Sequence, residues 1–339
     1  MKEKLMHMIR LLRPVGISLL IIFCVFCVTP VAGWGMIASN ASRLTLYEED
    51  SGLHMLLGAS VDVENGDMTY TIQGPEGGGW KSELAWDLEN VVYLGVNASA
   101  TFLKDFQTNV GFWKSVTEDS GLMKDSDWLF ADYGDSRAVY SESDITVDAF
   151  HLDINFRYNL LRSETLLLGP MVGYSYRNWQ WETGEGYQTS INPYQFYSGP
   201  LPPAGESPPS ITYEQQLQIP YVGVALSLFP ERFLLNSNVY ALYSPLAYCE
   251  DEDDHVLRSK LNTGESDGTF FAVGGDIRWQ YRNRWSFTGK VTYTTYDLEG
   301  DQDQYFYAGS NVGTRFTDID LSIEGSQVYL GFVVGYSFL

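Results

Sequence analysis

FHLDINFRYNL, residues 150–160, is the stretch of this sequence that decides the fold. Its apolar and aromatic side chains occupy every second position, and polar or charged side chains stand between them. Period-two alternation is the pattern of a β-strand that has one apolar face and one polar face. The same pattern recurs in residues 271–282 and 285–296. The sequence therefore predicts an all-β chain built from two-faced strands.

The polar faces of these strands indicate what lies on each side of the sheet. They carry few Lys or Glu residues and repeatedly place Arg close to Asp, as at Asp276 and Arg278. A hydrated interior with lipid outside explains this better than a soluble sandwich does. Aromatic residues make up 15% of the chain, with 23 Tyr and 9 Trp, as expected for the aromatic girdles of a membrane barrel. Beyond the N-terminal segment no stretch approaches roughly 18 consecutive apolar residues, which excludes a helical membrane protein.

Short and long connections alternate along the chain. The short ones fall near residues 102–107, 161–164, 230–232 and 282–284, and the long ones near residues 117–143, 181–211, 249–268 and 298–317. Bacterial barrels alternate periplasmic turns with longer outer loops in this way. With a tight tip near Glu64 to Asp67 added, the pattern predicts a ten-stranded antiparallel transmembrane β-barrel with long extracellular loops. An even strand number closes the barrel and leaves both chain ends in the periplasm.

The N-terminal segment has the composition of an export signal. Basic residues come first, an apolar core follows over residues 15–28, and small residues end it at 31–33. We therefore expect a signal peptide over residues 1–33 and one barrel domain over residues 34–339, located in the outer membrane. Only Cys249 remains after residue 33, so an internal disulfide is not possible.

The chain is strongly acidic. It has 21 Lys and Arg against 43 Asp and Glu, a net charge of −22. Residues 1–33 hold four of the basic residues and one of the acidic ones, so the barrel itself is more acidic still. Such a surface disfavours nucleic acid as a partner, and it attracts basic peptides by long-range steering.

Two clusters in the predicted outer loops carry residues that can do chemistry. The first is MKDSDW, residues 123–128, in which Asp125 and Asp127 are two residues apart. In extended backbone this spacing directs both carboxylates to the same side, so that one raises the pKa of the other or both hold a water. The second is DEDDH, residues 251–255, in which Asp253 stands two residues before His255. A carboxylate beside an imidazole orients a general base.

Other interpretations of these clusters stay open from the residues alone. Acidic loops on a barrel also serve as solvated tips or bind divalent cations, so a non-enzymatic adhesin or cation-binding surface barrel is the alternative function. A pore is disfavoured because inward side chains largely fill ten strands. Cys249 has acidic neighbours that make its thiol sluggish. A zinc site needs more His or Cys than the loops provide.

The two clusters in this order, within a ten-stranded barrel, resemble the omptin family of outer-membrane proteases. The resemblance covers nearly all of residues 34–339 and is most specific at 123–128, 251–255 and 213–223. It implies that Asp125 and Asp127 face Asp253 and His255 across a cleft open to the exterior. It further implies that water is the nucleophile, with His255 as the base and Asp253 as its orienting residue. Asp125 and Asp127 would position the water and manage charge in the tetrahedral intermediate, with no metal or cofactor.

The resemblance also implies a preference for peptide or protein substrates with basic residues. In the family, two acidic residues form the pocket for the side chain before the cut bond. The matching positions are Asp67, at the predicted tip of the first outer loop, and Asp251; Met123 is a further expected substrate contact. Two carboxylates favour the guanidinium fork over an ammonium, so we expect cleavage after Arg or Lys, with Arg preferred.

Lipopolysaccharide activates family members through basic and acidic residues on the barrel wall. At the matching positions Tyr174 is kept, Arg177 is one place out of register and expected to face inward, and the others differ, namely Tyr176, Asn178, Gln216 and Asn262. Two alternatives follow. This chain binds the lipid through other residues, or it acts without it.

Overall fold

The computed structural model describes residues 53–338 except 75–78, 104, 130–135, 164, 192–195, 202–208, 229–234 and 282–283. The signal peptide expected at residues 1–33 therefore lies outside the described residues. Nearly every described residue belongs to a strand. The elements are β1 (His54–Gln73), β2 (Lys81–Phe102), β3 (Phe106–Ser115), β4 (Asp119–Trp128), β5 (Val139–Tyr158), β6 (Leu161–Arg162), β7 (Leu166–Ser190), β8 (Gly199–Leu201), β9 (Thr212–Leu228), β10 (Leu235–His255), the 3-10 turn η2 (Val256–Arg258), β11 (Lys260–Tyr281), β12 (Trp285–Phe306) and β13 (Arg315–Phe338).

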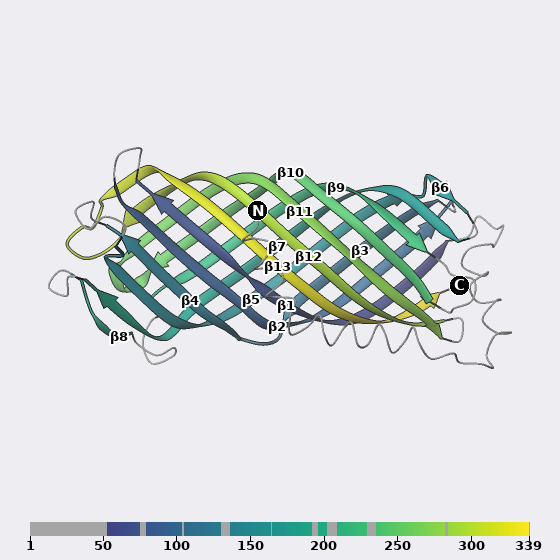
Figure 1. Cartoon of the computed structure of the whole chain (residues 1–339), viewed down its shortest axis with the longest axis horizontal. Helices are drawn as coiled ribbons and strands as arrows, with labels where there is room; N and C mark the ends of the chain where they lie inside the picture. Colours follow the sequence, from purple (N-terminus) through teal and green to yellow (C-terminus); the bar gives the residue numbers. More distant parts are fainter. Residues whose placement is uncertain are drawn as a thin grey trace.

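The strands close into a tilted, elongated barrel (Figure 1). All pairings between neighbours are antiparallel, and β13 pairs with β1 from Met55 opposite Phe338 to Gln73 opposite Asp320. Strands β3 and β4 lie one after the other in the same place, between β2 and β5. Over the described residues this gives ten strand positions around the ring, which confirms the predicted architecture. The short β6 and β8 lie at opposite ends of the barrel, and we call the end with β8 the outer end.

The strands are much longer than a bilayer requires. Strands β1, β2, β5 and β7 have 20 to 25 residues, whereas a tilted strand crosses a membrane in about 9–11. The regions expected as outer loops, such as residues 117–143 and 249–268, are mostly strand, so the bounds expected for these loops are wrong and the strands run further outward. A tight tip near Glu64 to Asp67 is wrong too, because β1 runs through these residues and pairs on both sides. The outer halves stand in water, and their polar outward faces resemble loops in composition.

At the level of the membrane the outward side chains are apolar and the inward ones polar. Exposed apolar residues here include Leu57, Val61, Leu94, Val96, Val222, Val224 and Phe332. Inside lies a polar cavity of about 350 Å³, whose lining includes His151 and Arg177. Within it Lys290 Nζ lies 2.6 Å from Asp62 Oδ1, and Arg177 donates to Tyr329. The predicted polar lining of the lumen and the inward direction of Arg177 are confirmed.

In the outer half of the barrel the inward side chains are apolar and the outward ones are polar. The inward side chains form a core of stacked aromatic rings, in which Trp86 and Trp181 each lie 5.5 Å from Tyr213 between ring centroids. Along β7 the inward positions run from Arg177 in the cavity to Trp179 and Trp181 in this core. The aromatic layer therefore covers the lumen on its outer side. It also supports the side chains that lie between it and the outer end. Among the described residues no helix is long and apolar enough to cross a membrane.

A candidate active site above the aromatic layer

The predicted acidic pair lies on β4, in the wall of the outer half. Met123, Asp125 and Asp127 alternate along the strand, so all three point inward. Met123 is 1% exposed and belongs to the apolar core, where it supports the two carboxylates above it. It is therefore a core residue, and its expected contact with substrate stays a prediction. Asp125 and Asp127 are buried as well, so two carboxylates lie side by side in a place of low polarity.

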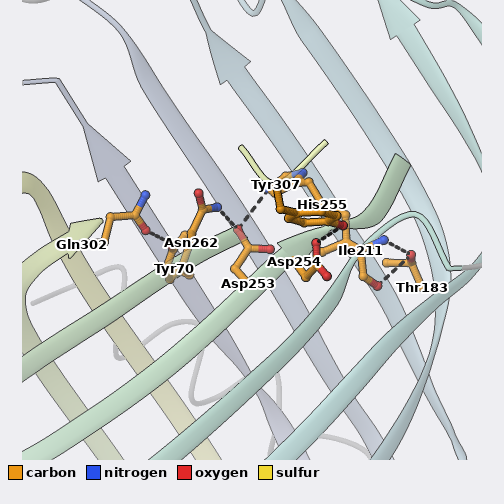
Figure 2. Close-up of polar contacts among 9 residues, drawn as sticks. All are labelled: Tyr70, Thr183, Ile211, Asp253, Asp254, His255, Asn262, Gln302 and Tyr307. Carbon is orange, nitrogen blue, oxygen red and sulfur yellow. Dashed lines mark hydrogen bonds and ion pairs between the residues drawn. The ribbon is translucent and has the colours of Figure 1, made fainter. Parts of the chain in front are cut away.

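The second predicted pair lies at the end of β10. Asp253 and His255 both point inward, and His255 Nε2 lies 3.0 Å from Asp253 Oδ2 (Figure 2). Asp253 is completely buried. Because η2 connects β10 tightly to β11, Lys260 stands opposite His255 in the ladder. Its side chain also lies on the inward face of β11.

The two pairs belong to one site although their strands are not neighbours. Strand β4 pairs with β2 and β5, whereas β10 pairs with β9 and β11, so the pairs approach each other across the opening. The charge of Asp253 contributes to raising the pKa of Asp125, and the charge of Lys260 acts on both carboxylates. The structure thus brings together all four residues that the sequence predicted for the cleft.

The surroundings of the acidic pair and of His255 favour different protonation states in the two. Burial, and then the charge of Asp127, raise the pKa of Asp125 to about 8, against the opposing charges of Arg258 and Lys260. One proton is therefore held by the acidic pair at neutral pH. Burial lowers the pKa of His255 below its usual range, although Asp253 acts in the opposite direction. The imidazole is accordingly neutral and available as a base.

The bond between Asp253 and His255 fixes which ring nitrogen is free. Burial alone would raise the pKa of Asp253, but the charge and hydrogen bond of His255, the charge of Lys260 and the hydrogen bond of Asn262 outweigh burial, so the pKa of Asp253 is lowered. An ionised carboxylate only accepts hydrogen bonds, so Nε2 of the neutral imidazole carries the proton. The lone pair is then on Nδ1, which is the atom that can take a proton from water.

Asp251 is the inward residue of β10 next to Asp253, on the side away from His255 and the outer end. Only 6% of it is exposed, and neither carboxylate oxygen has a hydrogen-bond partner among the described residues. It occupies the space above Gly264, its ladder partner, where a Cβ would collide with the carboxylate. Burial, and then the charge of Asp253, raise the pKa of Asp251 to about 8. A buried carboxyl group whose two oxygens have no partner can bind a cation or a hydrogen-bond donor.

Asp67 does not lie on the inward side with Asp251. We had expected the two acidic residues to form one pocket for the side chain before the cut bond. Asp67 is in the middle of β1 on the outward face, opposite Asp87 in the ladder, and its Oδ1 lies 3.4 Å from Ser326 Oγ. The inward neighbours are Met68 and Tyr70. Tyr70 is hydrogen-bonded to Gln302, and both lie near Asp253 (Figure 2). The prediction failed because a shift of one residue in a strand moves a side chain to the opposite face.

Three residues near the predicted site were not expected there from the sequence, namely Lys260, Asn262 and Gln302. The first two would have been found if residues 256–259 had been interpreted as a tight hairpin turn, because Lys260 and Asn262 then stand opposite His255 and Asp253. The wall position expected for Asn262 is wrong, since its side chain is inward and completely buried. For Gln302 the sequence gives no comparable signal.

The outer wall at the positions matched to lipid contacts carries neutral side chains. Tyr174 and Tyr176 on β7 point outward, and Tyr176 Oη donates to Gln216 Oε1 over 3.1 Å. Asn178 donates to Glu214 over 2.7 Å. These side chains hydrogen-bond to one another across β7 and β9, and Arg177 lies on the other face of the strand.

Known proteins resemble this chain in sequence and in fold. The model of the omptin family matches residues 53–338. The plasminogen activator of Yersinia pestis is 24% identical over 263 residues, which cover 77% of this chain and 82% of that protein. The crystal structure of the outer membrane protease OmpT from Escherichia coli superposes with a TM-score of 0.74 at 19% identity, over 86% of this chain and 99% of the OmpT chain. This chain therefore belongs to the omptin family of outer-membrane proteases.

Proposed function

We propose that this omptin is an endopeptidase that cleaves after basic residues and uses water activated by Asp253 and His255. The observation that carries the proposal is the buried Asp253–His255 hydrogen bond of 3.0 Å, which faces a second carboxylate pair holding a proton. One base and one acid on opposite sides of a cleft are what water-mediated peptide hydrolysis needs.

The proposed reaction follows from these protonation states. His255 Nδ1 takes a proton from a water molecule as its oxygen attacks the scissile carbonyl carbon. Asp253 stabilises the imidazolium that forms. The proton held by Asp125 and Asp127 is placed to bond the developing oxyanion. Collapse of the tetrahedral intermediate breaks the C–N bond, and the imidazolium returns its proton to the leaving amine, so no covalent enzyme intermediate forms.

Asp251 supports the preference for a basic side chain before the scissile bond. It lies near Tyr70 and Tyr213, whose ring centroids are 5.5 Å apart, since its charge contributes to raising the pKa of both phenols. A guanidinium can bond both oxygens of one carboxylate and stack on an aromatic face, whereas an ammonium is a point charge. Arg is therefore the proposed preferred residue over Lys, with one carboxylate and aromatic rings in place of the two carboxylates expected from sequence.

The direct test is to incubate the refolded barrel with a peptide library, with and without lipopolysaccharide. Cleavage sites that cluster after Arg and Lys support the proposal. Absence of cleavage in both samples, or cleavage without preference for basic residues, contradicts it. The two samples also distinguish a chain that acts without the lipid from one that binds it through residues other than those matched on the β7 and β9 wall.

At saturating substrate, kcat is expected to follow a bell-shaped pH profile. The rising limb lies below the usual range of histidine because burial lowers the pKa of His255, and the falling limb lies near pH 8 because burial and Asp127 raise the pKa of Asp125 to about 8. The profile of kcat reports the enzyme–substrate complex, in which a bound basic side chain keeps Asp251 ionised. The measurement is kcat between about pH 4 and pH 10, a range that brackets the usual pKa values of carboxylates and tyrosine.

Asp125→Asn is the matched variant for this profile, because its amide resembles the protonated carboxyl in shape and cannot ionise. The falling limb should move away from pH 8 in this variant, and the rising limb should stay. If the falling limb remains near pH 8, the ionisation belongs to another group and the assignment to the acidic pair is wrong.

The value of kcat/KM for basic peptides is expected to fall as salt is added. The outer wall next to the pocket carries a row of four carboxylates opposite one another on successive strands, Glu250, Glu265, Asp301 and Asp320. Such a field raises the encounter rate of cationic peptides, and salt screens it over about 10 Å at 0.1 M. A matched pair of peptides, one with an additional Lys far from the scissile bond and one with Gln there, provides the measurement. Equal salt dependence for the pair would exclude steering by this wall.

A further inference from the structure

Asn262 contacts the proposed catalytic dyad directly from the neighbouring strand. Its Nδ2 donates to Asp253 Oδ2 over 2.7 Å, and this is the same oxygen that meets His255 Nε2 (Figure 2). Asn262 is the ladder partner of Asp253, so both side chains leave the sheet at the same height and on the same face. The contact is therefore built into the pairing of β10 with β11.

We infer that Asn262 is a positioning residue, which holds the Asp253 carboxylate in the orientation that keeps His255 ready as a base. The inference rests on the proposed function. Asp253 Oδ1 has no hydrogen-bond partner among the described residues. Both of these described donors act on one oxygen, and of the two the Asn262 amide takes no part in the proposed proton transfer.

The Asn262 amide also affects the pH at which the Asp253–His255 dyad loses its proton. Its donated hydrogen bond is one of the influences that keep the pKa of Asp253 low. A carboxylate that already accepts a strong hydrogen bond binds a further proton less readily, and this holds for the dyad as a unit. Asn262 therefore lets the dyad lose its proton at a lower pH, so that the base is free over a wider range.

Stability alone does not account for this residue. Asn262 Oδ1 is buried without a partner among the described residues, and such an atom costs free energy that an apolar side chain of similar shape would not. On the same inward face the chain elsewhere uses Phe270 and Ala272. The contact that the amide adds, and that an apolar side chain would lack, is the hydrogen bond to Asp253.

The test is Asn262→Leu, which removes the donor at similar volume, together with Asn262→Asp, which keeps the shape and replaces the donor by a charge. We expect kcat to fall about 10- to 100-fold in the Leu variant, the usual effect of a lost hydrogen bond to a charged group, with KM nearly unchanged. The rising limb of the kcat profile should move to higher pH in Asn262→Leu and further still in Asn262→Asp, because a second carboxylate strengthens proton binding.

Ser266→Ala is the control, because Ser266 is buried on the same face of β11 and its ladder partner is Cys249 rather than a residue of the dyad. It should keep the wild-type profile. Loss of activity in Asn262→Leu with the rising limb unmoved in both variants would reduce Asn262 to a structural residue and overturn the inference. Full activity in His255→Ala would overturn the proposed function instead. An inactive His255→Ala beside an Asn262→Leu with wild-type kcat and profile removes only the inference.

Discussion

Replacement of His255 by Ala is expected to lower kcat by about 10²- to 10⁴-fold, the usual loss when a general base is removed. His255 is buried at the mouth of the barrel and ends β10, so its loss leaves the strand pairing of the barrel intact. The alanine variant should still fold, which is checked by its altered migration in SDS before and after boiling. The measurement is kcat on a single peptide cleaved by the wild type.

Cys249→Ser is the control for this experiment. Cys249 is buried on the same face of β10, and burial followed by the charge of Asp251 raises its pKa well above the usual value of a thiol. It is therefore a poor nucleophile at neutral pH, and its replacement should leave kcat almost unchanged. An inactive Cys variant beside an active His variant would show that the nucleophile is a thiol and that the water mechanism is wrong.

Replacement of Asp251 by Ala is expected to lower kcat/KM for Arg peptides by about 10²-fold or more, because a buried cation then loses the carboxylate proposed to bind it. The loss should be small for a peptide with Ala before the scissile bond. In the absence of substrate the same change removes a buried carboxylate without partners, so the unfolding free energy should not decrease. Specificity and stability are thus expected to change in different directions.

Matched peptides with Arg, Lys or Ala before the scissile bond measure this effect in the wild type, in Asp251→Ala and in Asp67→Ala. The Asp67 variant is the control, because that side chain points away from the cleft. It should keep the wild-type preference. Equal rates for Arg and Ala in the wild type, or an unchanged preference in Asp251→Ala, would remove Asp251 from the pocket.

Much of the fold could be predicted because the strands in the membrane part of a barrel alternate between apolar outward residues and polar inward residues. Residues 150–160 alternate as predicted, and ten strand positions close the ring. The outer halves could not be recognised, because there the inward face is apolar and the outward face acidic, as in a soluble protein. Residues 249–255 follow this reversed pattern, and their charges suggested a loop where β10 continues.

The site was predicted where spacing alone determines the face of a strand. Asp125 with Asp127, and Asp251 with Asp253 and His255, are spaced by two and therefore share a face whatever the exact strand bounds are. Asp67 was placed by counting across an insertion, where an error of one residue exchanges inside and outside. Register across strands was equally inaccessible, which is why Asn262 was assigned to the wall although it pairs with Asp253.

The aromatic layer has a consequence for the cell that carries this protein. Trp86, Trp181 and Tyr213 fill the barrel between the polar cavity and the cleft, and each is at most 1% exposed. Among the described residues this packed layer separates the polar cavity from the cleft, so we expect ions and nutrients to find no passage along the axis. We therefore expect that many copies of this barrel at the surface of a bacterium leave the passive permeability of its envelope unchanged.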